Sequence, residues 1–190
     1  MSINLHNGIN FMWLLVGAYW AVGALRAKPA VRREPTLMRA VQMASMVLAY
    51  ALLLSSPARI GAMGLRFVPD SPAIGWIGFC ILAVGAVLAI WARTILGSNW
   101  SSMVTVKRDH ELVRQGPYAF VRHPIYSGLL LCFAGTAIAH GEVRGLVALA
   151  IAFLSWSYKA GLEEKFMEQE FGDEYARYKH AVKRLIPGIY

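Results

Sequence analysis

Long stretches without a charged residue constrain the fold of this chain more than any other feature of its sequence. Five of them occur, at residues 1–25, 40–58, 71–92, 123–141 and 145–158. A helix of about 20 apolar residues crosses the roughly 30 Å hydrocarbon core of a bilayer, and the first four stretches are long enough. The fifth is shorter, but Lys159 can snorkel from a helix end and residues 160–162 extend the apolar run. The sequence therefore predicts an all-α integral membrane protein with five transmembrane helices.

The composition agrees with a membrane domain and excludes several other classes of protein. Of the 190 residues, 57% are hydrophobic and 16% are charged, which is typical neither of a disordered chain nor of an ordinary soluble domain. A net charge of +8 on so apolar a chain indicates contact with membrane lipids rather than with nucleic acid. Cys80 and Cys132 both lie in apolar runs, which argues against a disulfide framework and a cysteine-based zinc site. We expect no metal.

The uneven distribution of lysine and arginine predicts the orientation of the chain in the membrane. Sixteen of the nineteen lie in three places, which are the loop between the first and second stretches, residues 93–122, and the segment after the fifth stretch. The opposite side receives three, which are Arg59, Arg66 and Arg144. By the positive-inside rule, the first loop, residues 93–122 and the C-terminus face the cytoplasm, and the amino terminus faces out.

We expect a single membrane domain over residues 1–190 with its chemistry in the second half. Residues 1–92 supply three spans, and residues 93–190 form a catalytic half with two spans and a cytoplasmic C-terminal helix. The last two spans form a tight hairpin that turns at residues 139–142. An aromatic stripe within residues 166–185 predicts an interfacial helix against lipid headgroups, with the wall of a ligand site as the alternative.

Polar residues gather where the fourth stretch begins. Pro124 suits the first turn of a helix, where its missing N–H costs nothing, and this places His123 at the cap. The unpaired N–H groups and the helix dipole would attract an anionic group beside Arg122. A Gly-Pro pair at 116–117 predicts a turn that returns Tyr118 toward His123. An interfacial belt without a ligand is the alternative.

A second polar group follows the fifth stretch. Glu163 and Glu164 are adjacent, so their side chains diverge by about 100° on a helix and we expect at most one to reach a given site. Lys159 and Glu163 are four residues apart and share a helix face. A solvated ion pair is the ordinary interpretation, whereas a functional site is the sharper one because the pair lies at the end of a membrane helix.

Together these segments resemble the isoprenylcysteine carboxyl methyltransferase family, within a wider group of membrane methyltransferases that includes phospholipid methyltransferases. The similarity covers about the last 95 residues, in an ordered set of motifs. The matching segments are residues 97–100, 110–113, 116–118, 122–126, 163–164, 171–175 and 184–187.

The resemblance implies S-adenosylmethionine as the methyl donor, S-adenosylhomocysteine as its product, and a lipophilic acceptor such as the carboxylate of an isoprenylcysteine. Lys159 takes the place of the basic residue that binds the acceptor carboxylate, where the eukaryotic enzymes have arginine, and Arg184 is a second candidate for that role. The implied donor-binding residues are His110, Glu111, Leu112, Val113, Tyr118, Arg122, His123, Pro124, Ile125, Tyr126 and Glu163.

Methyl transfer fits the residues that the sequence offers. The positive charge of a sulfonium disappears in the transition state, so the protein mainly aligns two reactants and excludes water. A carboxylate acceptor needs no general base, and the sequence shows no obvious nucleophile relay. Two other interpretations remain, namely a membrane reductase that uses a nicotinamide cofactor and a non-catalytic scaffold whose basic face binds anionic lipid.

Overall fold

A computed structural model describes the chain at residues 3–25, 36–97 and 112–190. Within these ranges the chain is helical, with two isolated β-bridges and no strand. The α-helices are α1 (Ile3–Leu25), α2 (Thr36–Leu54), α3 (Pro72–Leu96), α4 (Pro124–His140), α5 (Val143–Phe171) and α6 (Asp173–Ala181). Short 3₁₀ helices lie at η1 (Ser56–Ala58), η2 (Gly61–Gly64) and η4 (Gly116–Ala119). The predicted all-α architecture is confirmed.

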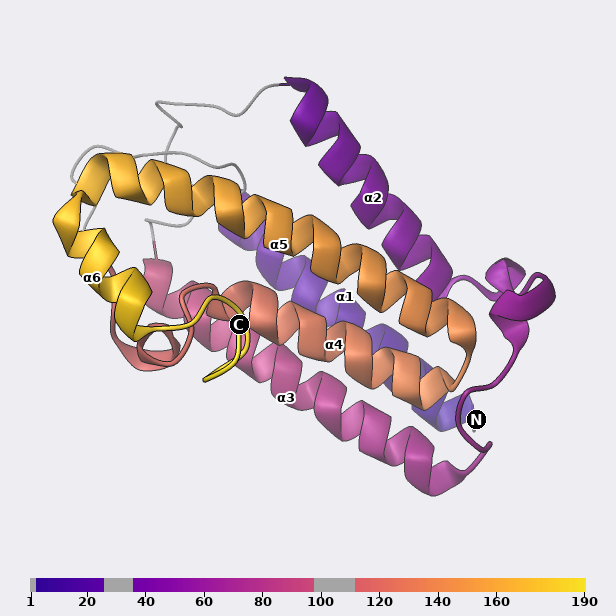
Figure 1. The fold of residues 1–190 in the computed structure, drawn as a ribbon. Helices are drawn as coiled ribbons and strands as arrows, with labels where there is room; N and C mark the ends of the chain where they lie inside the picture. The colour runs from indigo at the N-terminus through magenta and orange to yellow at the C-terminus, as the bar shows by residue number, and fades with distance from the viewer. Residues whose placement is uncertain (1–2, 26–35, 98–111) are drawn as a thin grey trace.

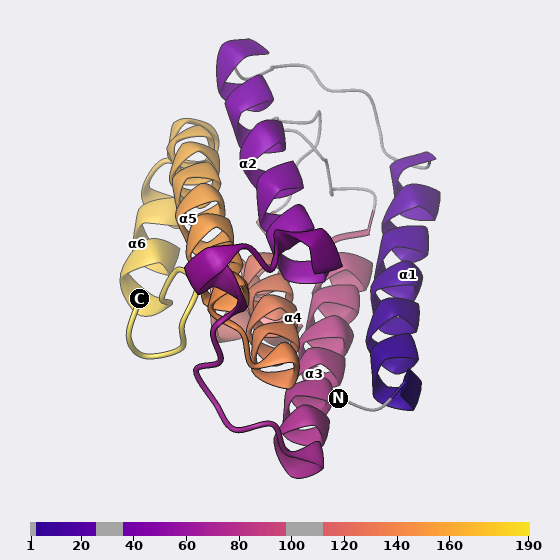
Figure 2. The same ribbon diagram turned by 90° about the vertical axis from the view of Figure 1, so that its right-hand side faces the viewer.

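The five long helices form a bundle around α4. Figure 1 shows α4 between α3 and α5, with α1 behind them, and Figure 2 shows α2 and α1 along the other side of the bundle. The contacts agree, because α4 packs on both α3 and α5, α2 packs on α5, and α1 packs on α3. The short α6 and the C-terminus lie at the end of the bundle where α4 begins.

Glycine residues let α3 and α4 approach each other closely. A Cβ atom added at Gly78 would lie 2.5 Å from the carbonyl oxygen of Gly135, and one added at Gly85 would lie 2.6 Å from the carbonyl oxygen of Gly128. Gly78 and Gly85 are seven residues apart on α3, as are Gly128 and Gly135 on α4, so the glycines of each helix lie on one face. Such small residues let backbones approach in membranes, where packing rather than the hydrophobic effect holds helices together.

Aromatic side chains fill the space between α1, α2, α4 and α5. The ring of Phe133 on α4 makes edge contacts with Trp13, Tyr50 and Trp156, at centroid distances between 5.0 and 5.5 Å. The indole N–H of Trp13 donates to the Thr136 hydroxyl at 3.0 Å, so this buried polar atom is satisfied. The aromatic cluster therefore ties the two N-terminal helices to the second half of the chain.

The hairpin between α4 and α5 turns where the sequence predicts. α4 ends at His140, Gly141 has a φ of +70°, and α5 begins at Val143. A buried ion pair supports the turn, since the Arg144 side chain donates to Glu142 at 2.5 Å. Arg144 also donates to three carbonyl groups at the end of α2, those of Leu52, Leu53 and Ser55. These contacts hold the end of α2 against the hairpin.

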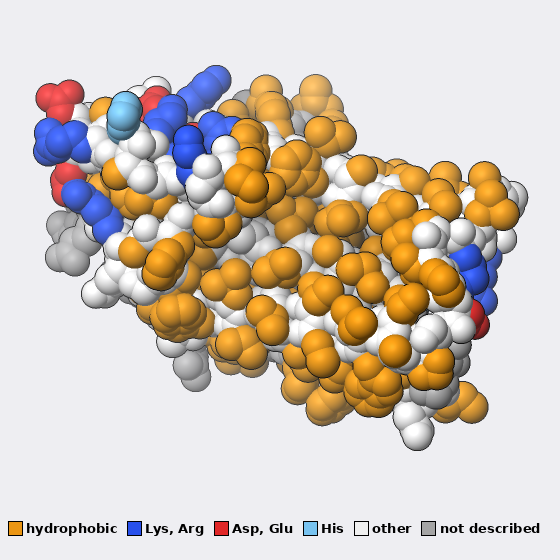
Figure 3. Space-filling model, turned by 60° about the horizontal axis from the view of Figure 1, so that its bottom comes forward, with side chains coloured by type: hydrophobic (Ala, Val, Ile, Leu, Met, Phe, Trp, Pro, Cys, Tyr) orange, Lys and Arg blue, Asp and Glu red, His pale blue; other side chains and the backbone are white. Residues whose placement is uncertain are grey.

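One face of the bundle is apolar along its length (Figure 3). Figure 3 shows charged side chains at the two ends and hydrophobic side chains between them. Among the described helices, α2, α3 and α5 are long and apolar enough to cross a membrane, and α4 is a shorter apolar helix of 17 residues. These features are typical of an integral membrane protein. The count of five spans stays a prediction.

The close packing of α3 on α4 makes a prediction about stability. A Cβ at position 135 would meet the Leu82 nitrogen and, at 2.5 Å, the Gly78 carbonyl oxygen, whereas one at Gly161 would meet nothing within 4 Å. Gly135→Ala should therefore lower the stability by about 1–3 kcal/mol, the usual cost of overpacking. Thermal unfolding in detergent should show a lower Tm for Gly135→Ala and an unchanged or higher one for Gly161→Ala. Equal values for both would contradict the observed contact.

Candidate active site

The segment before α4 adopts the local structure that its sequence predicts. The turn at Gly116–Ala119 is a 3₁₀ helix whose glycine has a φ of +60°, which a residue with a side chain rarely adopts. Pro124 occupies the first turn of α4, and His123 is the cap residue. Tyr118 is buried, and its hydroxyl donates to the carbonyl of Ala92 on α3 at 3.4 Å. The turn is thereby anchored to α3.

The imidazole of His123 lies between two carboxylates of α5. Its Nδ1 is 3.3 Å from Oε2 of Glu163, and its Nε2 is 3.3 Å from Oε1 of Glu164. Burial of the ring opposes protonation, but the hydrogen bonds to Glu163 and Glu164 outweigh it and raise the pKa of His123 above its usual value. A protonated imidazole can donate to both carboxylates at once.

The sequence predicted that at most one of the two glutamates reaches a given site, yet the structure has both in contact with His123. Adjacent side chains do diverge on a helix, but the two nitrogens of one imidazole also point apart, so His123 contacts both Glu163 and Glu164. The hydroxyl of Tyr126 donates to Glu163 at 2.6 Å. The Tyr126 ring stacks on the His123 ring at 5.6 Å with an interplanar angle of 11°. The structure thus brings His123, Tyr126 and Glu163 together.

Glu164 is buried among cationic side chains. Arg122 donates to its Oε1 from Nε at 2.9 Å and from Nη2 at 2.7 Å. Arg184 donates from Nε to Oε1 at 3.1 Å and from Nη2 to Oε2 at 2.7 Å, which is a bidentate pair. The hydrogen bond to Glu164 raises the pKa of Arg184. Arg122 and Arg184 were expected to face substrates, but each already has a carboxylate partner.

The C-terminal segment packs against the entrance of α4. The backbone N–H groups of the two residues before Pro124 donate to the carbonyl groups of Lys183 and Arg184, at 2.8 and 3.0 Å. The Ser127 hydroxyl donates to the carbonyl of Leu185 at 2.6 Å. The first turn of α4 and the C-terminal segment are therefore one connected unit.

Half of the predicted aromatic stripe faces the protein rather than lipid headgroups. Tyr175, Tyr178 and Leu185 are all buried in the protein, with at most 6% of each residue exposed. The Tyr178 hydroxyl donates to the backbone carbonyl of Tyr118 at 2.6 Å, and burial raises the pKa of Tyr178 to about 12. For these residues the prediction is wrong, because α6 turns its tyrosines toward the α4 entrance. The sequence pattern alone does not say which surface the stripe contacts.

The other predicted site residues have varied placements. Lys159 lies one turn before Glu163 on α5, is partly exposed, and interacts electrostatically with Glu163. Pro124 and Ile125 are buried, and Leu112 and Val113 are partly buried in a segment without regular structure. His110 and Glu111 lie outside the described residues.

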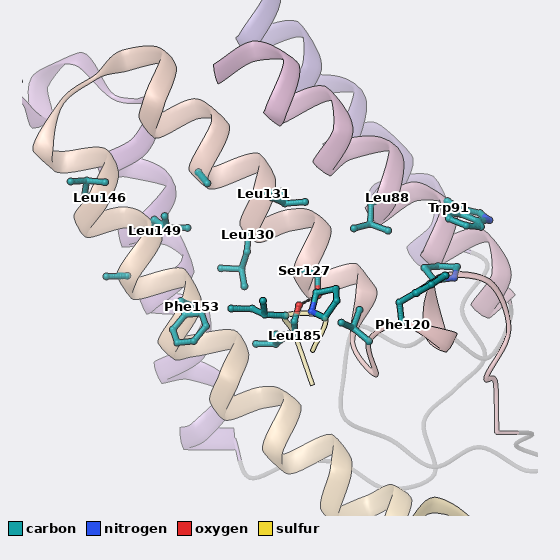
Figure 4. A pocket seen from close by; sticks show the side chains of 16 residues that line it. Leu88, Trp91, Phe120, Ser127, Leu130, Leu131, Leu146, Leu149, Phe153 and Leu185 are labelled. Atoms are coloured by element: carbon teal, nitrogen blue, oxygen red, sulfur yellow. Dashed lines mark hydrogen bonds between the residues drawn. The ribbon is translucent and has the colours of Figure 1, made fainter. Parts of the chain in front are cut away.

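Two apolar cavities adjoin α4 on different faces. The larger is a groove of about 730 Å³, and Figure 4 shows Leu88 and Trp91 of α3 on one side of it and Leu149 and Phe153 of α5 on the other. The smaller, of about 350 Å³, lies among α1, α2 and α4. Its lining residues are Trp13, Val16, Gly17, Trp20, Tyr50, Leu54 and Leu129.

Sequence reasoning missed the position of Glu164. The pair Glu163–Glu164 was recognised, but the number of cationic partners for each carboxylate depends on where the loop and the C-terminal segment fold back. The available signal was the pair of basic residues at 183–184, but only the folded chain brings this pair to the entrance of α4. Among the described residues, no three His, Cys, Asp or Glu side chains are grouped to hold a metal ion.

The sequence matches the family described as phospholipid methyltransferase over residues 73–174, which is more than half of the chain. This stretch includes α4, α5 and nearly all of α3. It therefore contains His123 and Tyr126 as well as Glu163 and Glu164. The match defines a class of membrane methyltransferase.

Named relatives identify the group within that class. Protein-S-isoprenylcysteine O-methyltransferase B of Arabidopsis thaliana is 29% identical over 131 residues, covering 65% of this chain and 66% of its own length. The enzyme of the same name, without the letter, from Tribolium castaneum is 34% identical over 131 residues, covering 65% and 46%. The Schizosaccharomyces pombe protein is 35% identical over 116 residues, covering 60% and 48%. This chain thus spans about half to two thirds of the length of these curated relatives.

A solved structure shows the same fold. A eukaryotic intramembrane Ras methyltransferase, described as an isoprenylcysteine carboxyl methyltransferase, is similar with a TM-score of 0.53 and 27% identity. The similarity covers 82% of this chain and 54% of that one. The chain therefore belongs to the phospholipid methyltransferase family, and its predicted kinship with the isoprenylcysteine carboxyl methyltransferases is confirmed.

Proposed function

We propose that this protein transfers a methyl group from S-adenosylmethionine to the carboxylate of a lipophilic acceptor of the isoprenylcysteine type. The observation that carries the proposal is the contact of Glu163 with both His123 and Tyr126, at the end of an apolar bundle. These residue types lie where the family resemblance implies a donor site. The names of the relatives support the acceptor class.

The site offers complementary groups for the charged parts of the donor. The side chain of Glu163 is 21% exposed, and its carboxylate suits an ammonium group or ribose hydroxyls. The start of α4 has no side-chain cap, and its helix dipole favours an anionic group at this end of the bundle. When bound, the donor would supply an activated methyl group on a sulfonium. The protein would align the two reactants and exclude water.

Lys159 is the better candidate for the acceptor carboxylate. Arg184 already donates to Glu164 from two nitrogens and to the Tyr190 hydroxyl from the third, at 3.1 Å. Lys159 lies one turn from Glu163 on the same face of α5. Its ammonium group is a point charge with three donors, and it can hold a carboxylate without the planar fork of arginine.

The smaller cavity suits the hydrocarbon part of the acceptor. Tyr126, Leu129 and Phe133 lie on one face of α4. Tyr126 contacts Glu163 on α5, and Leu129 lines the smaller cavity. Along this face, the Tyr126 ring stacks on Trp156 at 6.1 Å, and Trp156 contacts Phe133 at 5.5 Å. The larger groove includes Ser127 and Leu131, which lie on a different face of α4 from Tyr126.

The orientation predicted from the basic residues places this site at the cytoplasmic surface. A single cysteine at Ile60, which is 76% exposed near η2, should react with a membrane-impermeant reagent applied to intact cells. A single cysteine at Lys183 should react only after the cells are opened. Both variants would lack Cys80 and Cys132. Labelling at position 183 from outside would reverse the proposed orientation.

Binding of the donor product should depend on the charge of Glu163. The purified protein should bind S-adenosylhomocysteine in calorimetry, and Glu163→Gln should weaken binding by about 1.5–3 kcal/mol, the range for hydrogen bonds to charged groups. Glu168→Gln is the matched control, because Glu168 lies on the same helix, is exposed, and pairs with Lys179. Absence of binding to the unsubstituted protein would contradict the donor assignment.

Filling the smaller cavity should weaken the acceptor and spare the donor. A Cβ at Gly17 would meet nothing within 4 Å, so Gly17→Leu should project into the cavity without disturbing the helices. We expect the KM for a long-chain prenylcysteine to rise about tenfold, a typical cost for a hydrophobic pocket that loses room, with donor affinity unchanged. The exposed neighbour Ala18, changed to Leu, should have no effect. An unchanged KM in Gly17→Leu would place the acceptor chain elsewhere.

A further inference from the structure

Glu164 takes no part in the reaction as proposed, yet its carboxylate accepts hydrogen bonds from three side chains of the site region. We propose that Glu164 is a positioning residue, which acts through His123 to fix the direction in which Glu163 presents its carboxylate to the methyl donor. The inference rests on the proposed function, because it concerns how Glu163 meets that donor.

Exposure separates the tasks of the two glutamates. The side chain of Glu163 is 21% exposed, whereas that of Glu164 is 2% exposed. Glu163 is the more exposed side chain, whereas the carboxylate of Glu164 is taken up by Arg122, His123 and Arg184. Direct contact between Glu164 and a bound donor would therefore have to be replaced by contact through a neighbouring side chain.

His123 is the neighbour that connects them. Its Nε2 lies 3.3 Å from Glu164, and its Nδ1 lies 3.3 Å from Glu163. An imidazole fixed at one nitrogen alone can still turn about its side-chain torsions, whereas one fixed at both nitrogens has a single orientation. Glu163 is then held at Oε2 by His123 and at Oε1 by the Tyr126 hydroxyl. Each oxygen keeps acceptor capacity for a ligand.

Glu164 can serve as a fixed point because it is itself held rigidly. Arg122 comes from the segment before α4, and Arg184 comes from the C-terminal segment, so the carboxylate is gripped from two directions. The same arrangement occurs around metal sites, where groups behind the direct ligands orient them and tune their basicity. Here the held group is an imidazole, and the group that it orients is the Glu163 carboxylate.

A purely structural role for Glu164 is the competing explanation. In that case, its charge would serve only to neutralise Arg122 and Arg184, and its loss would loosen the whole end of the bundle. The two explanations differ in whether the effect of Glu164 depends on Glu163. Residues that act through one another give non-additive effects, whereas independent ones give effects that add in free energy.

A double-mutant cycle on donor-product affinity tests the proposal. The dissociation constant of S-adenosylhomocysteine is measured for the unsubstituted protein, Glu163→Gln, Glu164→Gln and the double variant, with Glu168→Gln as the control. We expect Glu164→Gln to raise the Kd about tenfold alone, but about twofold or less once Glu163 is an amide, because the coupled group is already lost. An equal factor in both backgrounds would overturn the positioning role.

Folding of the variants needs a safeguard, because removing one partner of a buried ion pair is strongly destabilising. Glu164→Asp keeps the charge but shortens the side chain by one methylene, and it enters the same cycle. It should bind the donor product more weakly than the unsubstituted protein while eluting as the same folded species. Full affinity in a folded Glu164→Asp protein would overturn the proposal, because a withdrawn carboxylate could not hold His123.

One outcome separates the failure of the proposed function from the failure of this inference. If the unsubstituted protein does not bind S-adenosylhomocysteine, the proposed function fails. The positioning role is then decided by the side-chain nitrogen resonances of His123, in protein with labelled histidine. These resonances should shift in Glu164→Asp, because the contact at Nε2 changes. Unchanged resonances would show that Glu164 does not hold the ring.

Discussion

The pairing of buried charges at one end of an apolar bundle is the constraint on which the site depends. A charge removed from water must find a partner, and Glu164 finds one in each of two separate segments. Arg122 brings the entrance of α4, and Arg184 brings the C-terminal segment. The backbone of the C-terminal segment then accepts hydrogen bonds from the α4 entrance. The need to pair these buried charges therefore holds the two segments of the site together.

Different faces of α4 make different contacts in the bundle. One face carries Gly128 and Gly135, which let α3 pack at backbone distance. Another carries Tyr126, Leu129 and Phe133, which connect Glu163 to the smaller cavity. The helix is short, with 17 residues, but it contacts α3, α5 and α2 and so fixes the position of the Glu163 end of the bundle relative to the apolar interior. Placing both substrates along one rigid helix would favour their alignment for transfer.

Local features could be predicted from the sequence because they depend on neighbouring residues. Pro124 at the helix entrance, the turn at Gly116 and the hairpin at Gly141 all follow from backbone preferences. The apolar runs gave the helices for the same reason. The family was also predicted from the sequence, because motifs typical of it occur in the same order and at similar spacings.

The partners of each charged group could not be predicted, because they come from segments far apart in the chain. Glu164 and Arg184 are 20 residues apart, and Glu164 and Arg122 are 42 apart. Helical geometry indicated that the adjacent glutamates diverge, which is correct, but it did not show that one imidazole lies between them. The aromatic residues of α6 were likewise identified, while the surface that they contact depended on the fold.

Methyl transfer itself is the most direct test of the account. The protein in lipid or detergent is incubated with S-adenosylmethionine labelled in its methyl group and with a prenylated cysteine that has a free carboxylate. The matched control is the same compound with its carboxylate converted to an amide. We expect label in a base-labile methyl ester of the free acid and none in the amide. Label that appears in the amide, or a protein that binds the donor yet never methylates the free acid, would contradict it.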